Sequence, residues 1–139
     1  MILRPGDLIL YGADAGLPFF QWLKWGQRLA GLPGAFSHVE IVTEPDKVIS
    51  SYWSPGDLDG VLEVDRYNLP AQVIRPPATE DQILSIITRA RSFIGKPYSW
   101  KNCLQLAWDR RWDKKIGIPV DSGLHCSQLI AMCLTAGSL

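Results

Sequence analysis

Short apolar segments separated by turn residues occupy the middle of the chain, and this pattern constrains the fold more than any other feature. Three such segments lie at residues 36–43, 47–53 and 61–66. The turns between them, EPDK (44–47) and SPGDLDG (54–60), are rich in residues that favour chain reversal. Connections this short join antiparallel neighbours. We therefore expect an antiparallel meander in this region.

Two further segments extend the strand pattern. PGDLILY (5–11) begins with a turn dipeptide and continues as a short strand. AQVIRP (71–76) adds another strand, which stops at Pro76 and Pro77. The sequence thus predicts an antiparallel sheet of about five strands.

Helical signals follow the last strand. Thr79 and Gln82 form a capping-box pattern, and apolar residues continue it at helical spacing as far as Gly95, the expected stop. Further helices are expected at about 101–113 and from near Ser122 or Leu124 to Gly137. Because the chain shows no repeat or linker, we expect residues 1–139 to form a single α+β domain.

The composition is that of a globular protein with no charge excess. The formal net charge is +0, and 47% of the residues are apolar. The chain lacks the basic excess that would favour nucleic acid as a partner. The charges in WDRRWDKK (108–115) alternate in sign, as they do on solvated helix faces. No apolar stretch approaches the roughly 18 residues of a membrane span.

The cysteine count and the N-terminal sequence bear on localisation. Three cysteines without a CxxC motif favour a reducing compartment over a disulfide framework. MILRPGDLIL lacks the layout of a signal peptide. We therefore expect a cytoplasmic protein, with delivery to the cell wall by another route left open.

Residues 14–34 are unusually aromatic. Phe19, Trp22 and Leu29 can share one helical face, bounded by prolines and glycines. One interpretation is a core helix, weakened by its glycines. The other is a lid or an interfacial segment that contacts a membrane or lipid through Phe19, Trp22 and Trp25.

Cys126 is the first candidate for a chemical role. It lies in HCSQ (125–128), at the expected start of the final helix. There a sulfur is close to unsatisfied backbone N–H groups and to the positive end of the helix dipole, which favour the nucleophilic thiolate. The alternative is a small buried apolar residue. We assign that second role to Cys103 and Cys133, which lie within apolar helical patterns.

His38 and Glu40 lie two residues apart in FSHVEIV (36–42). Along a strand they share one face, with Val39 and Ile41 on the other. A catalytic imidazole needs a second group on its other nitrogen to fix its orientation, and a carboxylate one alternation away is within reach. The alternative is a solvent-exposed sheet face, where histidine and glutamate are ordinary.

His125 is a weaker candidate for the base. Adjacent helical residues diverge by about 100°, so its ring is not expected to aim at the Cys126 sulfur. A helix N-terminus also disfavours imidazolium. Two histidines and scattered cysteines lack the spacing of a structural zinc site, which takes four nitrogen or sulfur ligands. We expect neither a metal nor a cofactor.

Four short motifs together resemble one enzyme family. GKPYSW (95–100) followed by HCSQLI (125–130) resembles the glycine–x–proline–tyrosine and cysteine–serine motifs of the NlpC-like cell-wall peptidases, a branch of the papain superfamily. RPGDLIL (4–10) followed by SHVEIV (37–42) looks like that family's glycine–aspartate strand and histidine strand. Ordinary members place the cysteine motif first. The reversed order here is similar to the circularly permuted branch, which includes YiiX-like amidases and lecithin–retinol acyltransferase-like enzymes.

This resemblance spans about residues 4–136 and implies a papain-like core, in which a small sheet packs against a cysteine-bearing helix. It matches Cys126 to the nucleophile and His38 to the general base. It matches Tyr98 to a tyrosine beside the nucleophile that supports the oxyanion, although simple packing would also explain this residue.

The third polar group stays open between two residues. The family position falls near Ser50, but a carboxylate orients imidazole better than a hydroxyl does, which favours Glu40. His125 departs from the aspartate that often precedes the cysteine in ordinary members, and this weakens any inference about a peptide substrate.

The expected function is that of a cysteine hydrolase that cleaves an amide bond, in a cell-wall peptide or an acylated amine, through a thioester on Cys126. One alternative is an acyl-lipid thioesterase or acyltransferase, suggested by the aromatic residues at 19–29. Another is a binding module that retains the fold without turnover. The sequence is silent on the oligomeric state.

Overall fold

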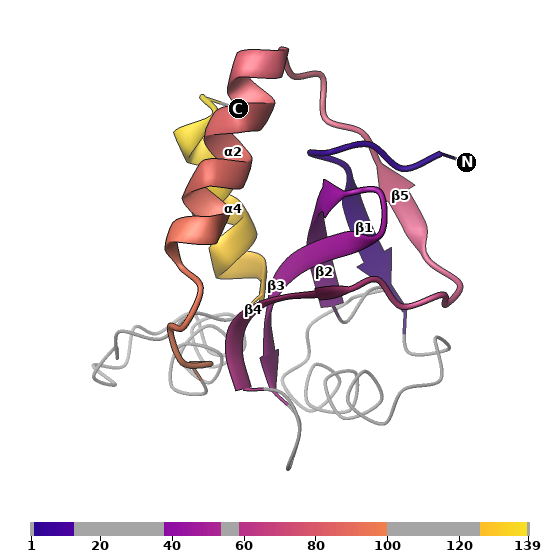
Figure 1. The fold of residues 1–139 in the computed structure, drawn as a ribbon, viewed down its shortest axis with the longest axis vertical. Coiled ribbons are helices and arrows are strands. Elements are labelled where there is room, and N and C mark those ends of the chain that lie inside the picture. The colour runs from indigo at the N-terminus through magenta and orange to yellow at the C-terminus, as the bar shows by residue number, and fades with distance from the viewer. Residues whose placement is uncertain (1, 13–37, 54–58, 100–125, 139) are drawn as a thin grey trace, which may run out of the picture.

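The computed structural model describes residues 2–12, 38–53, 59–99 and 126–138. The described part of the chain forms five strands and two helices (Figure 1). These elements are β1 (Leu8–Tyr11), β2 (His38–Glu44), β3 (Lys47–Trp53), β4 (Asp59–Asp65), β5 (Gln72–Ile74), α2 (Glu80–Ser92) and α4 (Cys126–Ala136). The α+β class and the five-stranded antiparallel sheet predicted from the sequence are thereby confirmed.

The strands form one sheet in the order β4-β3-β2-β1-β5. The expected meander accounts for β2, β3 and β4, although β4 begins at Asp59, inside the stretch that the sequence assigned to a turn. The last strand does not continue this meander. It pairs with β1 at the opposite edge, with Leu8 facing Ile74, and Val73 packs against the apolar cluster that contains Ile9.

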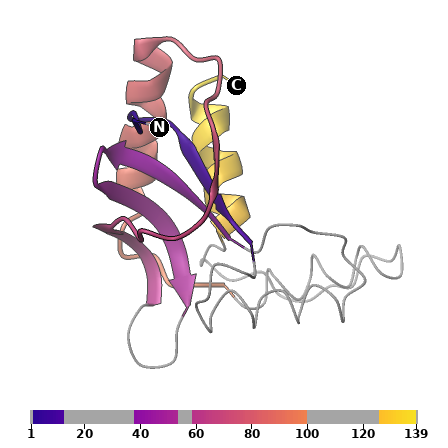
Figure 2. The same cartoon turned by 90° about the vertical axis from the view of Figure 1, so that its right-hand side faces the viewer.

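Side chains alternate between the two faces of the sheet, and each face carries a cluster of buried residues. On one face α2 and α4 lie side by side (Figure 2), and α4 packs against β2 and β3. The core between these helices and the sheet includes Ile41, Ile49 and Leu129, each with no exposed surface. On the other face Ile9, Tyr11, Val42 and Val48 form a second cluster. Along β2, for example, Ile41 faces the helices and its neighbour Val42 faces this second cluster.

The entry into β1 is fixed by the glycine–aspartate pair of the RPGDLIL motif. Gly6 has a positive φ of 89° and donates its N–H to Val42 O at 2.8 Å. The buried Asp7 carboxylate accepts two hydrogen bonds of 2.7 Å from Arg75 and one of 2.9 Å from Arg4 N–H. Burial alone would raise the pKa of Asp7, but these donors hold it below its usual value.

The α2 helix begins as the sequence predicts. Thr79 Oγ1 accepts a hydrogen bond from Gln82 N–H, and Gln82 Oε1 accepts one from Thr79 N–H. The helix ends at Ser92, and Gly95 follows with a φ of 92°. Gly95 N–H then donates to Val61 O at 3.0 Å, and Lys96 O accepts a bond of 2.8 Å from Val61 N–H. The start of the GKPYSW motif is therefore joined to β4.

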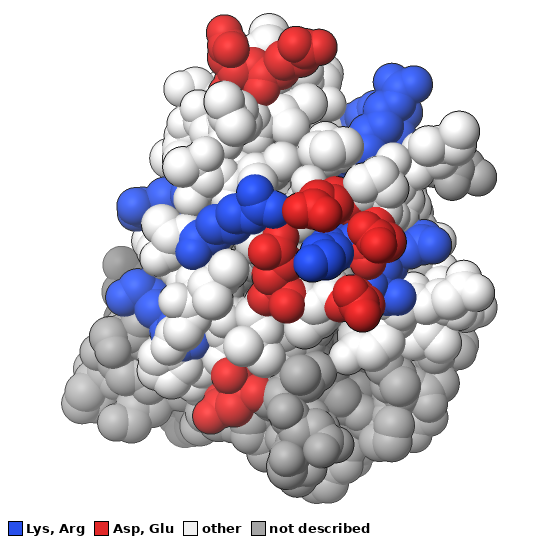
Figure 3. All heavy atoms as spheres, viewed as in Figure 1, with Lys and Arg blue, Asp and Glu red and all other residues white. Residues whose placement is uncertain are grey.

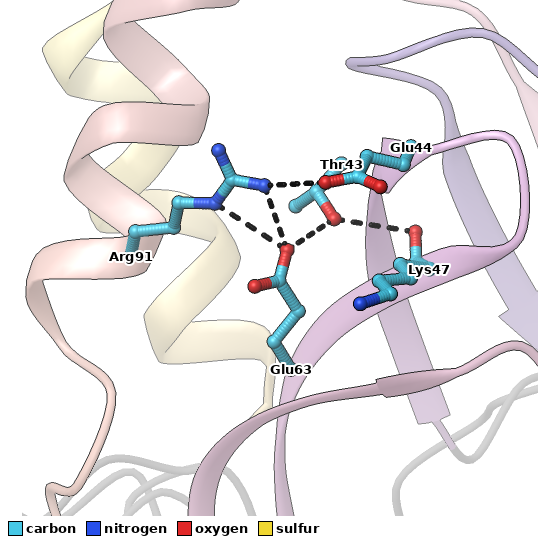
Figure 4. Close-up of polar contacts among 5 residues, drawn as sticks. All are labelled: Thr43, Glu44, Lys47, Glu63 and Arg91. Carbon is cyan, nitrogen blue, oxygen red and sulfur yellow. Dashed lines mark hydrogen bonds and ion pairs between the residues drawn. The ribbon is translucent and has the colours of Figure 1, made fainter.

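A charged network joins the last turn of α2 to the sheet (Figure 4). Arg91 reaches Glu63 Oε1 at 2.9 Å and Glu44 Oε1 at 3.3 Å, while the buried Thr43 hydroxyl donates to Glu63 Oε1 at 2.6 Å. Acidic and basic side chains gather together on this face of the molecule (Figure 3). Exposed pairs of this kind contribute little each, about 0–1 kcal/mol, so the apolar contacts carry most of the α2 packing.

Several expectations fall outside the described residues. These are the aromatic segment at 14–34 with Phe19, Trp22 and Trp25, the helix at about 101–113, Cys103 and His125. Neither helix in the described part of the chain is long and apolar enough to cross a membrane.

Candidate active site

His38 is the first residue of β2, and its imidazole is enclosed by aromatic rings. Only 2% of the residue is exposed. Tyr11 lies opposite His38 in the β1–β2 register, and its ring centroid is 6.2 Å from that of the imidazole in a stacked arrangement. Tyr52, from β3, approaches to 5.1 Å with its ring tilted. The imidazole is thus held between two tyrosines from the neighbouring strands.

Glu40 lies on the same face of β2, with its carboxylate beside the imidazole. Its side chain has no exposed surface, and its Oε1 atom is 3.4 Å from His38 Nε2. The Tyr52 hydroxyl donates a hydrogen bond of 2.7 Å to that same oxygen. The alternative of a solvent-exposed face is therefore wrong. It fails because the second apolar cluster and the tyrosine rings cover this side of the sheet.

Cys126 is the first described residue of α4, and its thiol contacts His38. Burial would raise the pKa of this thiol. Its interaction with the His38 side chain, the charge of the imidazolium, and backbone N–H groups of Val39 and Ser127 lower the pKa below its usual value instead. The sulfur from the end of the chain and the imidazole from its first third therefore meet, as the sequence interpretation requires.

The electrostatics of His38 agree with those of the thiol. Burial acts to lower the pKa of the imidazole, but the interactions with Cys126 and with Glu40 outweigh it and raise the pKa to about 9. One partner is thus driven toward the cation and the other toward the anion. The arrangement favours an imidazolium–thiolate pair, with the Glu40 carboxylate also beside the ring.

Cys133 shows what a cysteine without such partners does in the same helix. Its side chain is fully buried in the core between the helices and the sheet. Burial raises the pKa of this thiol to about 11, and the charge of Arg89 opposes that rise. The assignment of Cys133 to an apolar packing role agrees with this environment. The two cysteines of α4 thus provide a built-in comparison of thiol reactivity.

The other sequence candidates lie in different settings. The Ser50 hydroxyl is buried and donates to Val39 O at 2.6 Å, so it bonds the backbone of β2 and not the imidazole. Of the two candidates for the third polar group, Glu40 is the one placed against His38. Tyr98 is buried in the segment that follows α2. Its part in holding an oxyanion remains a prediction.

The sequence interpretation missed Tyr11 and Tyr52. Strand alternation contained a signal for Tyr52, since it lies two residues after Ser50 and therefore on the same face of β3. Tyr11 ends β1, but its position opposite His38 depends on the pairing register between two strands separated by residues 12–37, which no local pattern fixes.

The described residues contain no group of three or more histidine, cysteine, aspartate or glutamate side chains close enough to hold a metal ion. In comparisons with known proteins, no family model matches the chain and no curated protein matches it significantly.

Proposed function

We propose that this protein is a cysteine hydrolase of the circularly permuted NlpC-like type, and that it cleaves an amide bond through a thioester on Cys126. The observation that carries this proposal is the contact of the Cys126 thiol with His38, an imidazole that also faces the Glu40 carboxylate. A nucleophile, a base and a group that orients the base are the three components that covalent acyl transfer requires.

In the first half of the proposed reaction, the Cys126 thiolate attacks the carbonyl carbon of the amide, forming a tetrahedral intermediate. The carbon–nitrogen bond then breaks as the His38 imidazolium gives its proton to the leaving amine. The products are the free amine and a thioester between Cys126 and the acyl group. Since Nε2 faces Glu40, we assign the proton transfer to Nδ1.

In the second half, neutral His38 removes a proton from water, and the resulting hydroxide attacks the thioester carbonyl. Breaking the carbon–sulfur bond releases the carboxylic acid and returns the thiolate–imidazolium pair. Backbone N–H groups near the start of the cysteine helix, together with Tyr98, are assigned to the oxyanion in this scheme. Loss of one such donor typically lowers the rate about 100-fold or more.

The fold supports the same assignment in its coarse features. A cysteine-bearing helix packs against a small antiparallel sheet, and the histidine lies at the end of a strand in that sheet. A papain-like arrangement places its nucleophile and base in this relation. The acyl-lipid alternative depends on the aromatic residues at 19–29, which lie outside the described part of the chain.

Covalent capture of the acyl group tests the proposal. We expect intact-mass spectrometry to detect an acyl adduct on the wild-type protein after incubation with substrates drawn from cell-wall peptide fragments, N-acyl amines and acylated lipids. Peptide mapping should place the added mass on Cys126, because its thiolate is the proposed nucleophile.

The matched control is Cys126→Ala, with Cys133→Ala as a second cysteine variant of the same helix. The proposal requires that the adduct disappear in the first variant and persist in the second. An adduct with lipids alone would favour the acyl-lipid alternative. If none of the three compound classes acylates Cys126 while the thiol still reacts with iodoacetamide, amide hydrolysis loses its support.

A further inference from the structure

A second residue acts on the carboxylate that faces His38. Glu40 Oε1 is shared between two partners, His38 Nε2 at 3.4 Å and the Tyr52 hydroxyl at 2.7 Å. Among the described residues, the other carboxylate oxygen, Oε2, makes no hydrogen bond. The hydrogen bond from Tyr52 is thus made to the same oxygen that meets the imidazole, while Tyr11 from β1 also interacts with the Glu40 side chain.

Tyr52 is well placed to fix that oxygen. It is 2% exposed, and its ring packs against the imidazole with centroids 5.1 Å apart. A buried hydroxyl that donates to a carboxylate makes a short, charge-assisted bond, stronger than one between neutral groups. Burial, the Glu40 charge and this hydrogen bond all raise the pKa of Tyr52, so the hydroxyl keeps its proton and remains a donor.

We propose that Tyr52 is a positioning residue, which holds Glu40 Oε1 against His38 Nε2 and so keeps the imidazole oriented toward Cys126. This inference rests on the proposed function for its purpose, but its physical content is a coupling between three side chains. Tyr52 touches neither substrate nor sulfur in this scheme and acts through Glu40.

The groups around His38 come from every element packed against it. They are Tyr11 from β1, Glu40 from β2, Tyr52 from β3, Cys126 from α4, and, at longer range through Tyr11 and Glu40, Arg66 and Tyr67 from the segment after β4. A change that weakens the carboxylate contact should lower the affinity of the imidazole for its proton. The pKa of His38 is therefore a quantity that a purely structural role of Tyr52 would leave unchanged.

The test is an NMR titration of the His38 imidazole in intact protein. Tyr52→Phe removes one hydroxyl and leaves the ring, so the carboxylate loses its anchor and the imidazolium loses part of its stabilisation. We expect the pKa of His38 to fall by about one unit, which corresponds to the loss of one hydrogen bond to a charged group. Tyr67→Phe is the matched control, because Glu40 acts on Tyr67 only through its charge, and the pKa of His38 should stay unchanged.

A double variant shows whether Tyr52 acts through Glu40. Glu40→Gln alone should lower the pKa of His38 at least as far as Tyr52→Phe does, and adding Tyr52→Phe to Glu40→Gln should lower it no further. An unchanged or higher pKa in Tyr52→Phe overturns the proposal, since Tyr52 would then be neutral or a competitor for Oε1. An equal fall in both backgrounds also overturns it, because Tyr52 would then act on the ring directly.

The wild-type protein provides a measurement that does not depend on the folding of the Tyr52 variant. The Tyr52 hydroxyl proton should exchange slowly with solvent in the wild type and rapidly in Glu40→Gln; equal exchange in both contradicts the contact. None of these measurements requires turnover. If Cys126 forms no acyl adduct but the titrations behave as stated, the proposed function fails and the positioning role stands. If Cys126 is acylated but the titrations do not behave as stated, the positioning role fails and the proposed function stands.

Discussion

Replacing His38 with alanine should lower the rate at which iodoacetamide alkylates Cys126 at pH 7 by about tenfold. A thiol of ordinary pKa, about 8.5, is only a few per cent thiolate at this pH, whereas a thiol beside an imidazolium is mostly thiolate. The gain in thiolate is partly offset, because a thiolate of lower pKa is a weaker nucleophile, with a Brønsted coefficient of roughly 0.4–0.5. Tenfold is the net effect that these two tendencies leave.

Peptide mapping by mass spectrometry measures this rate separately for each cysteine. Cys133 is the internal reference, since its thiol is buried in the core and its pKa is raised to about 11. Glu44→Gln is the matched control variant, because Glu44 lies on the same strand but is exposed and joined to Arg91 instead of the site. An unchanged Cys126 rate in His38→Ala, with the fold intact by circular dichroism, would show that His38 does not activate the thiol.

Gly60→Ala should destabilise the protein by about 3 kcal/mol or more. Gly60 has a φ of 87°, which costs an L-residue roughly 1–2 kcal/mol. A Cβ there would also lie 2.3 Å from Lys96 O, a backbone atom that Val61 N–H already binds at 2.8 Å. The carbonyl cannot retreat without giving up this bond, whose loss adds about 1–3 kcal/mol. Thermal unfolding should show a fall in Tm of roughly 10 °C.

Gly95→Ala isolates the steric part of this effect. Gly95 has nearly the same φ, 92°, but a Cβ at this position would meet nothing within 4 Å. We expect this variant to lose only the conformational part, about 1–2 kcal/mol. Equal losses in the two variants would contradict the close approach of the GKPYSW segment to β4. Since that segment contains Tyr98, Gly60→Ala is also a test of how firmly it is held.

The elements that local patterns specify were predicted well. Turn residues at 44–47 and alternating apolar residues led to β2 and β3, and the capping box at Thr79 led to the start of α2. The pairing of β5 with β1 was not predicted. A strand of three residues has too little pattern to choose its neighbour, and its position depends on the burial of Val73 across the sheet.

The candidate site was predicted only in part, again because local patterns do not determine how strands pair. Strand alternation placed His38 and Glu40 on one face, and the permuted motif order suggested that Cys126 would meet them. Burial of that face was not evident from residues 36–42, because the tyrosines that cover it come from two other strands. The contact of Tyr52 with Glu40 is likewise a property of the strand register and could not be obtained from either strand alone.

The dependence of Cys126 alkylation on pH tests most directly whether the Cys126 thiol and the His38 imidazole form an ion pair. The pKa of this thiol is lowered and that of His38 is raised to about 9. The ion pair should therefore persist from the pKa of the thiol up to about pH 9. We predict that the alkylation rate rises at acidic to neutral pH and is nearly level by pH 8. A rate that instead keeps climbing through pH 8.5, as for an ordinary thiol, would contradict the account.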